Sequence, residues 1–196
     1  MTRCVGVFGG AFDPPHVAHA ALARAAVDQL ALDELRILPT GDAWHKSRPL
    51  SPAPHRLAMA RLAFAGLPRV VVDERELRRA GPTYTVDTLR ELLAEQPGAQ
   101  LFLVLGEDQA AALTRWHDWE TVVALAVIAV AGRAATPGEV HAALPPQARF
   151  RSLALPPMPA SATAIRSLVG SGRPIAGLVA PGVASYIDRH HLYQQP

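Results

Sequence analysis

The sequence predicts an α/β fold in which a doubly wound parallel sheet carries helices on both faces. Short aliphatic runs alternate along the chain with longer alanine- and leucine-rich segments that have the period of a helix. The aliphatic runs are apolar almost throughout, which is typical of strands buried on both sides. The chain has 196 residues, no internal repeat and no linker-like segment, so we expect one domain over residues 1–196.

The elements of this sheet can be placed in order. Six strands are expected, the last of them the weakest, at Cys4–Phe8, Leu35–Leu38, Val70–Val72, Leu101–Leu105, Ala126–Val130 and Phe150–Leu153. Five helices are expected at Ala18–Leu30, Pro54–Ala65, Val86–Glu95, Gln109–Leu113 and Thr163–Val169. The apolar run Val122–Ala131 is shorter than the roughly 20 residues of a membrane-spanning helix and is expected to be a buried strand. A Rossmann-like sheet of this kind binds ligands at the carboxyl ends of its strands.

The composition indicates in which cellular compartment the protein works and which classes of partner it does not bind. A net charge of +2 is too small for a protein that tracks a nucleic-acid polymer. The single cysteine, Cys4, excludes an intrachain disulfide and suits a reducing compartment. The N-terminal apolar stretch is too short for a secretory signal, so we expect a soluble, cytoplasmic protein with no membrane partner. Arginine supplies all the basic residues except Lys46, which makes this lysine a candidate functional residue.

The loop after the first strand reads GGAFDPPHVAH from Gly9 to His19 and leads into a helix. Gly9 and Gly10 allow the backbone to approach a bulky ligand, and the amides of the helix start form an anion site. His16 and His19 are three residues apart, so they share one face at the positive end of the helix. A phosphate site is favoured over a plain capping loop with two exposed histidines. A zinc pair is the third reading, but further ligands at zinc spacing are lacking.

A second candidate phosphate site lies near the C-terminus, where Ser161 is expected to cap a helix. Thr163 lies in the first turn and Arg166 one turn further on. A cation near a helix N-terminus is disfavoured by the helix dipole, so Arg166 indicates an anionic ligand nearby. An ordinary helix cap would explain Ser161 alone.

Both segments resemble motifs of the nucleotidyltransferase superfamily with the HIGH-type motif. The first loop is similar to G-[ST]-F-D-P-x-H-x-G-H, with Ala11 in place of the hydroxyl residue and Ala18 in place of glycine. The second is similar to I-S-x-[ST]-x-I-R, which holds the β- and γ-phosphates of ATP in that superfamily. The resemblance implies that ATP is bound by Phe8, Gly9, Gly10, His16, His19, Lys46, Ser161, Thr163 and Arg166.

The middle of the chain resembles the bacterial nicotinate-nucleotide adenylyltransferases. Lys46 ends the segment GDAWHK, which is similar to P-x-x-x-P-H-K, where the lysine meets the ATP phosphates; a solvated loop lysine is the plain alternative. The segment from Thr83 to Leu89 is similar to S-Y-T-x-[DQ]-T-L, although a helix cap at Thr85 would also explain it. The implied nicotinate-nucleotide contacts are Thr85, Gly106, Asp108, Trp116 and His117.

Each of these contacts has a role implied by the resemblance. Asp108 would bind a ribose hydroxyl, or serve only as an acid at a helix start. Trp116 would stack on the pyridine ring, while Trp119 is better explained as a core residue. Thr85 and His117 would help to bind the nicotinate carboxylate through backbone amides.

The implied reaction joins ATP and nicotinate mononucleotide to give deamido-NAD and pyrophosphate. The 5′-phosphate of the mononucleotide attacks the α-phosphorus directly, with His16, His19, Lys46 and Arg166 as the catalytic residues. Mg²⁺ would be held mainly by the ATP phosphates, and no protein metal ligands are expected.

The alternatives keep the same fold. One is an adenylyltransferase for nicotinamide mononucleotide or pantetheine phosphate, and another is a non-catalytic nucleotide sensor. A class I aminoacyl-tRNA synthetase shares a related histidine loop but would need a tRNA-binding body, for which this chain is too short.

Overall fold

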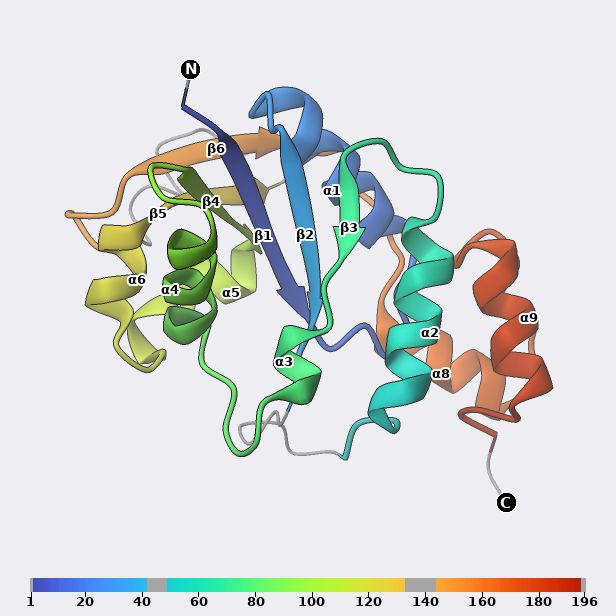
Figure 1. The fold of residues 1–196 in the computed structure, drawn as a ribbon. Coiled ribbons are helices and arrows are strands. Elements are labelled where there is room, and N and C mark those ends of the chain that lie inside the picture. Colours follow the sequence, from blue (N-terminus) through green and yellow to red (C-terminus); the bar gives the residue numbers. More distant parts are fainter. Residues whose placement is uncertain (1, 42–48, 133–143, 195–196) are drawn as a thin grey trace.

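Six parallel strands form one sheet in the order β3-β2-β1-β4-β5-β6. The computed structural model describes residues 2–41, 49–132 and 144–194 (Figure 1). The strands are β1 (Cys4–Gly10), β2 (Glu34–Pro39), β3 (Val70–Val72), β4 (Gln100–Gly106), β5 (Ala126–Gly132) and β6 (Phe150–Ala154). All six expected strands are confirmed, including the weak one that became β6. The order reverses direction at β1, as in a doubly wound sheet.

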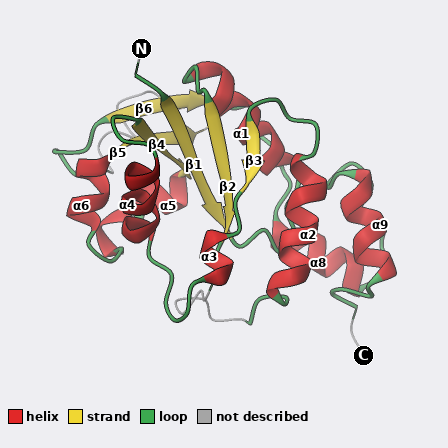
Figure 2. Ribbon diagram, viewed as in Figure 1, coloured by secondary structure: helices red, strands yellow, loops and turns green. Residues whose placement is uncertain are grey.

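Helices connect the strands and continue after the last one (Figure 2). They are α1 (Val17–Gln29), α2 (Ala53–Phe64), α3 (Arg75–Arg78), α4 (Thr85–Glu95), α5 (Glu107–Ala111), the 3₁₀ turn η1 (Leu113–Arg115), α6 (Trp119–Leu125), α8 (Ala162–Gly170) and α9 (Pro181–Arg189). The five expected helices are confirmed with shifted ends. Within the described ranges, no helix is long and apolar enough to cross a membrane.

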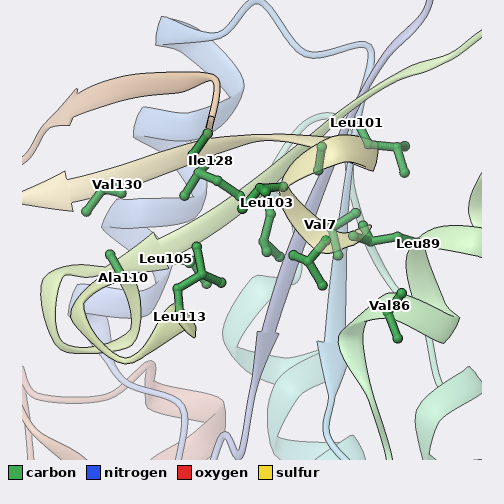
Figure 3. Close-up of a cluster of buried hydrophobic side chains, with 14 of the residues drawn as sticks. Val7, Val86, Leu89, Leu101, Leu103, Leu105, Ala110, Leu113, Ile128 and Val130 are labelled. Atoms are coloured by element: carbon green, nitrogen blue, oxygen red, sulfur yellow. The ribbon is translucent and has the colours of Figure 1, made fainter. Parts of the chain in front are cut away.

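Both faces of the sheet are buried. Successive side chains of β4 point to opposite faces, and each set packs against helices. Leu101, Leu103 and Leu105 pack in a cluster with α4, α5 and α6, part of which Figure 3 draws. Phe102 and Val104 point the other way, into a cluster with α1 and α2. Because each central strand is covered on both sides, its residues are apolar at every position, which is the pattern seen in the sequence.

The expected strand at Val122–Ala131 is wrong for its first four residues. These belong to α6, and β5 begins only at Ala126. No glycine, proline or polar residue separates the two elements, so a continuous apolar run conceals the boundary between a short buried helix and a buried strand.

A third apolar cluster joins the C-terminal helices to α2. It contains Met59 from α2, Ile165 from α8 and three residues from the C-terminal segment, Val179, Val183 and Ile187. The C-terminal segment thus packs against the rest of the domain. Helix α9 itself was not expected, although Pro181 at its first turn is a recognised start signal. Through this cluster α8 is held beside the loop that follows β1.

Candidate active site

The loop after β1 is pressed onto the core by Phe12. This side chain is 2% exposed and its φ of 47° lies in the left-handed region. Its ring packs edge-to-face on Phe8 and Phe64, with centroids 5.6 and 5.5 Å apart. A Cβ on Gly10 would lie 3.1 Å from the Phe12 ring, so Gly10 is needed for this fold-back. The Phe8 side chain is buried in the same cluster, which leaves only its backbone for a ligand.

The two histidines meet at the start of α1. His16 is the N-cap residue and His19 follows in the first turn, with stacked rings whose centroids are 3.8 Å apart. The backbone N–H of His16 donates to Nδ1 of His19 over 3.1 Å. Since Nδ1 accepts this bond, a neutral His19 carries its proton on Nε2 and can donate from there. Nδ1 of His16 is buried and has no hydrogen-bond partner among the described residues.

Burial keeps both imidazoles neutral at neutral pH. It lowers the pKa of His16 to about 4. The pKa of His19 is lowered to about 3, first by burial and then by repulsion from His16. The pair therefore presents N–H donors to a ligand, and positive charge at this site must come from other side chains.

Arg166 brings the two predicted phosphate motifs together. One guanidinium nitrogen donates to the backbone oxygen of Asp13 over 2.8 Å, and another donates to Oγ1 of Thr163 over 3.1 Å. Ser161 caps α8 as expected, accepting from the Ala164 amide over 3.2 Å. Arg166, however, is the fifth residue after the cap. It lies one turn beyond the start of α8, as expected, and at this distance from the N-terminus the dipole argument for an anion loses weight.

Asp13 is the centre of a buried network that sequence reasoning did not find. It is 3% exposed, and its carboxylate accepts from the Tyr193 hydroxyl over 2.6 Å and from the Ser51 amide over 3.2 Å. Arg56, also 3% exposed, donates to the carbonyls of Ser51, Ala11 and Thr40. We call these residues, with Arg166, the Asp13 network. It ties the loop after β1 to the end of β2, to α2, to α8 and to the C-terminal segment.

The residues expected to bind the pyridine nucleotide lie at the start of α4 and in the loop before α6. Tyr84 stacks on His117 with ring centroids 4.1 Å apart. Arg90 on α4 donates to Asp118 over 2.9 Å and joins the same two segments. Trp116 is partly buried and packs against the cluster beneath α4, as Trp119 does.

The local structure differs from the expected one at Thr85 and agrees with it at Asp108. Thr85 does not cap α4: Tyr84 holds the N-cap, without a side-chain hydrogen bond, and Thr85 is the first helical residue. Gly106 ends β4, and Asp108 is an exposed acid in the first turn of α5, as its plain reading expected.

A cavity of about 370 Å³ opens beside the histidine loop. Its walls come from the start of α1, the end of β5, the start of α5 and the segment after β6. The lining residues are Ala18, Glu107, Ala131, Gly132, Leu155, Pro156, Pro157, Met158 and Pro159. Ala18, one of the two departures from the superfamily motif, lines this cavity directly.

Lys46 lies outside the described residues, as does the segment from Asp42 to His45 that precedes it. The described residue next to this segment is Gly41. Gly41 follows the carboxyl end of β2.

Removing the Tyr193 hydroxyl tests the Asp13 network. Burial and the bond to Asp13 raise the pKa of this hydroxyl well above its usual range, so it stays a donor. Tyr193→Phe leaves a buried carboxylate with one donor fewer and should lower the free energy of unfolding by about 1–3 kcal/mol, measured by urea denaturation. The matched control is Tyr186→Phe, which loses a bond to the less buried His55 and should cost less than about 1 kcal/mol. Equal losses in both variants would contradict the network.

The neutrality of the histidine pair predicts a pH effect. Because the folded pKa values lie below the ordinary 6.5, the folded state binds fewer protons than the unfolded chain in acid. This contribution to stability is complete above pH 6.5 and is lost as the pH falls toward 3–4. Ring nitrogen NMR signals of His16 and His19 should stay unchanged from pH 8 down to about 5.5, whereas the urea-unfolded chain titrates near 6.5. Movement of these signals between pH 7 and 6 would show that the rings are not desolvated.

Comparison with known proteins identifies the family. The cytidylyltransferase-like family model matches residues 7–168. A protein of Albidiferax ferrireducens named "Probable nicotinate-nucleotide adenylyltransferase" is 59% identical over 193 residues, 97% of this chain and 98% of its own length. A protein of the same name from Chromobacterium violaceum is 47% identical over 215 residues, covering 99% of this chain and all of its own.

Solved structures agree in fold. The nicotinic acid mononucleotide adenylyltransferase of Plasmodium falciparum superposes with a TM-score of 0.80 over 97% of both chains, in one structure complexed with APC and in another with NaAD. At 16% and 17% identity this likeness bears on the fold alone. The sequence matches over nearly the whole chain go further: the protein belongs to the cytidylyltransferase-like family and, within it, to the nicotinate-nucleotide adenylyltransferases.

Proposed function

We propose that this enzyme transfers the adenylyl group of ATP to nicotinate mononucleotide, giving deamido-NAD and pyrophosphate. The observation that carries the proposal is the contact of Arg166 with the Asp13 carbonyl, because it places both phosphate motifs at one edge of the sheet. Relatives that share 59% and 47% of this sequence carry the name of that activity. One solved neighbour in fold holds NaAD, the product of the proposed reaction.

ATP would lie across the edge between the cavity and α8. The cavity beside Ala18 is mostly apolar and suits the adenosine half, since bases favour apolar slots with few polar groups. The triphosphate would then pass the first turn of α1 and reach Ser161, Thr163 and Arg166. The hydroxyl of Ser161 accepts from the backbone, so its own proton is available to a phosphate oxygen. Backbone atoms of Gly9 and Gly10 would face the same phosphates.

The chemical step needs no protein nucleophile. An oxygen of the mononucleotide 5′-phosphate attacks the α-phosphorus of ATP, and the bond from that phosphorus to the oxygen bridging to the β-phosphate breaks, releasing pyrophosphate. Catalysis is then positioning and charge stabilisation. His16 and His19 would donate hydrogen bonds to the α-phosphate oxygens, His19 from Nε2. Arg166 and Lys46 would stabilise the negative charge that develops on the leaving pyrophosphate.

The pyridine nucleotide would bind between the start of α4 and the loop before α6. Amides at the start of a helix point toward a ligand at its N-terminal end, and the amide of Thr85 would hold the nicotinate carboxylate. Trp116 would stack on the ring, with His117 beside it. Asp108 and Gly106 lie at the end of β4, where they would bind the ribose.

Mg²⁺ would enter with ATP and not from a preformed protein site. Within the described ranges, no group of three or more His, Cys, Asp or Glu side chains could hold a metal ion. The donors at the histidine loop are nitrogen groups, which suit phosphate oxygens better than Mg²⁺. When bound to the triphosphate, the ion would supply further neutralisation of its charge.

Release of pyrophosphate with different acceptors tests the proposed function. The enzyme is supplied with ATP, Mg²⁺ and one of three acceptors: nicotinate mononucleotide, nicotinamide mononucleotide or pantetheine phosphate. We expect the highest kcat/KM with nicotinate mononucleotide. A higher value with either other acceptor would assign the enzyme to a sister activity, and no turnover with any of them would favour a nucleotide sensor.

His19→Ala should lower kcat at least about a hundredfold, because it removes a donor to the transition state. Helix α1 is held to the core by Leu22, Ala23, Ala26 and Val27, so the circular dichroism spectrum should remain that of the wild type. His190→Ala, at the exposed end of α9, is the control and should leave kcat unchanged. Near-normal turnover in His19→Ala would remove His19 from the mechanism.

Lys46→Ala should raise the KM for ATP or slow the chemical step, because the ammonium group is expected to follow the phosphates during transfer. Steady-state kinetics with ATP varied at saturating nicotinate mononucleotide measure both. Lys46→Arg keeps the charge and serves as the matched variant. If both variants behave as wild type, Lys46 has no part in phosphate binding.

A further inference from the structure

Glu76 is a buried acid that the proposed reaction does not use. It lies on α3, is 7% exposed, and accepts a hydrogen bond at Oε1 from the hydroxyl of Thr88 over 2.8 Å. Thr88, which is completely buried on α4, accepts in turn from the Arg79 guanidinium over 3.3 and 3.4 Å. The chain from Arg79 through Thr88 to Glu76 thus ends on a carboxylate that fixes the first turn of α4.

The backbone of Glu76 marks a junction of three segments. A Cβ on Gly41 would lie 2.2 Å from the carbonyl oxygen of Glu76 and 2.6 Å from Oγ1 of Thr83. Only glycine fits this approach of the segment after β2 to α3 and to the residues before α4. Oγ1 of Thr83 is buried with no hydrogen-bond partner in the part of the chain that the structure describes. The three segments therefore meet next to the residues that lead into α4.

A carboxyl group in this place is costly to the fold. Burial raises the pKa of Glu76 to about 7, although the Thr88 hydrogen bond and Arg79 act in the opposite direction. The other charged groups that act on it are Asp73 and Glu91, which raise the pKa further. Since the folded pKa exceeds the ordinary 4.5, the associated stability is complete below pH 4.5 and is lost as the pH rises through 7. A neutral side chain would avoid this loss.

We propose that Glu76 is a positioning residue for the pyridine nucleotide. Through Thr88 its carboxylate sets the first turn of α4, and so the place of Tyr84 and Thr85 against His117. The inference rests on the proposed function, because it concerns the site where the nicotinate ring and carboxylate would bind. The ionised form is the active one, since a carboxylate accepts the Thr88 hydrogen bond more strongly than a neutral acceptor does.

The test is Glu76→Gln in the full-length enzyme, with the KM for nicotinate mononucleotide measured at pH 6 and pH 8. The amide oxygen can still accept from Thr88, so the variant resembles the protonated wild type. The KM ratio of variant to wild type should be about one at pH 6 and about fivefold at pH 8. Titration of the mononucleotide phosphate affects both proteins equally and cancels in this ratio. The KM for ATP should change less than twofold at either pH.

Two further measurements separate positioning from simple loss of structure. The thermal midpoint of the wild type should fall more between pH 6 and pH 8 than that of Glu76→Gln, because only the wild type ionises there. Glu95→Gln, which removes an exposed carboxylate at the last residue of α4 that binds Arg75, should leave the KM for nicotinate mononucleotide unchanged at both pH values. Thr88→Val should raise this KM at pH 8, and combining it with Glu76→Gln should add nothing more.

A KM ratio that is the same at both pH values, or an equal rise in the KM for ATP, would overturn the role of Glu76. Additive effects of Thr88→Val and Glu76→Gln would do the same. All these outcomes require that the wild-type enzyme turns over nicotinate mononucleotide. Failure of the proposed function would instead appear as no turnover in the wild type, so the two failures can be distinguished.

Discussion

The proposed phosphate end of this enzyme depends on the burial of one carboxylate, Asp13. This residue lies three positions before His16, the N-cap of α1. Its side chain accepts from the Tyr193 hydroxyl and the Ser51 amide, while its backbone carbonyl accepts from Arg166. A buried carboxylate that lacks donors is strongly unfavourable, so the loop after β1, the start of α2 and the C-terminal segment must assemble together. The last segment of the chain thereby shapes a loop that follows the first strand.

Burial in the neighbouring part of the loop determines the protonation state of the two histidines. Phe8 and Phe12 pack on His19, which removes water from the ring and favours its neutral form. The bond from the His16 amide then selects the tautomer with a proton on Nε2. A neutral donor of fixed direction needs no reorganisation when charge develops on the phosphate, which is the condition for electrostatic catalysis. The positive charge is supplied by Arg166, which the Asp13 network holds at the same edge.

The sequence predicted the strands and the cap of α8, because both depend on local patterns. Continuous aliphatic runs identify buried strands, and Ser161 caps α8 as its residue type suggests. It could not predict Arg56 or Tyr193, since their bonds to distant carbonyls and carboxylates leave no periodicity. The cap of α4 was placed one residue late, at Thr85, because residue preference favours threonine where the backbone in fact places Tyr84. The neutrality of His19 likewise follows from packing that no spacing encodes.

Two buried acids stabilise different segments at the proposed ligand-binding edge of the sheet. Asp13, on the proposed ATP side, accepts from a hydroxyl and a backbone amide, and its charge interacts with the Arg56 guanidinium. Glu76 fixes the start of α4 with one hydroxyl as its direct donor, so burial dominates and its pKa rises to about 7. Ionisation of Glu76 near pH 7 would change the contacts at the start of α4, where the proposal places the pyridine nucleotide, and would not involve the bonds of Asp13 on the proposed ATP side. The two substrates of one reaction would then respond to pH separately.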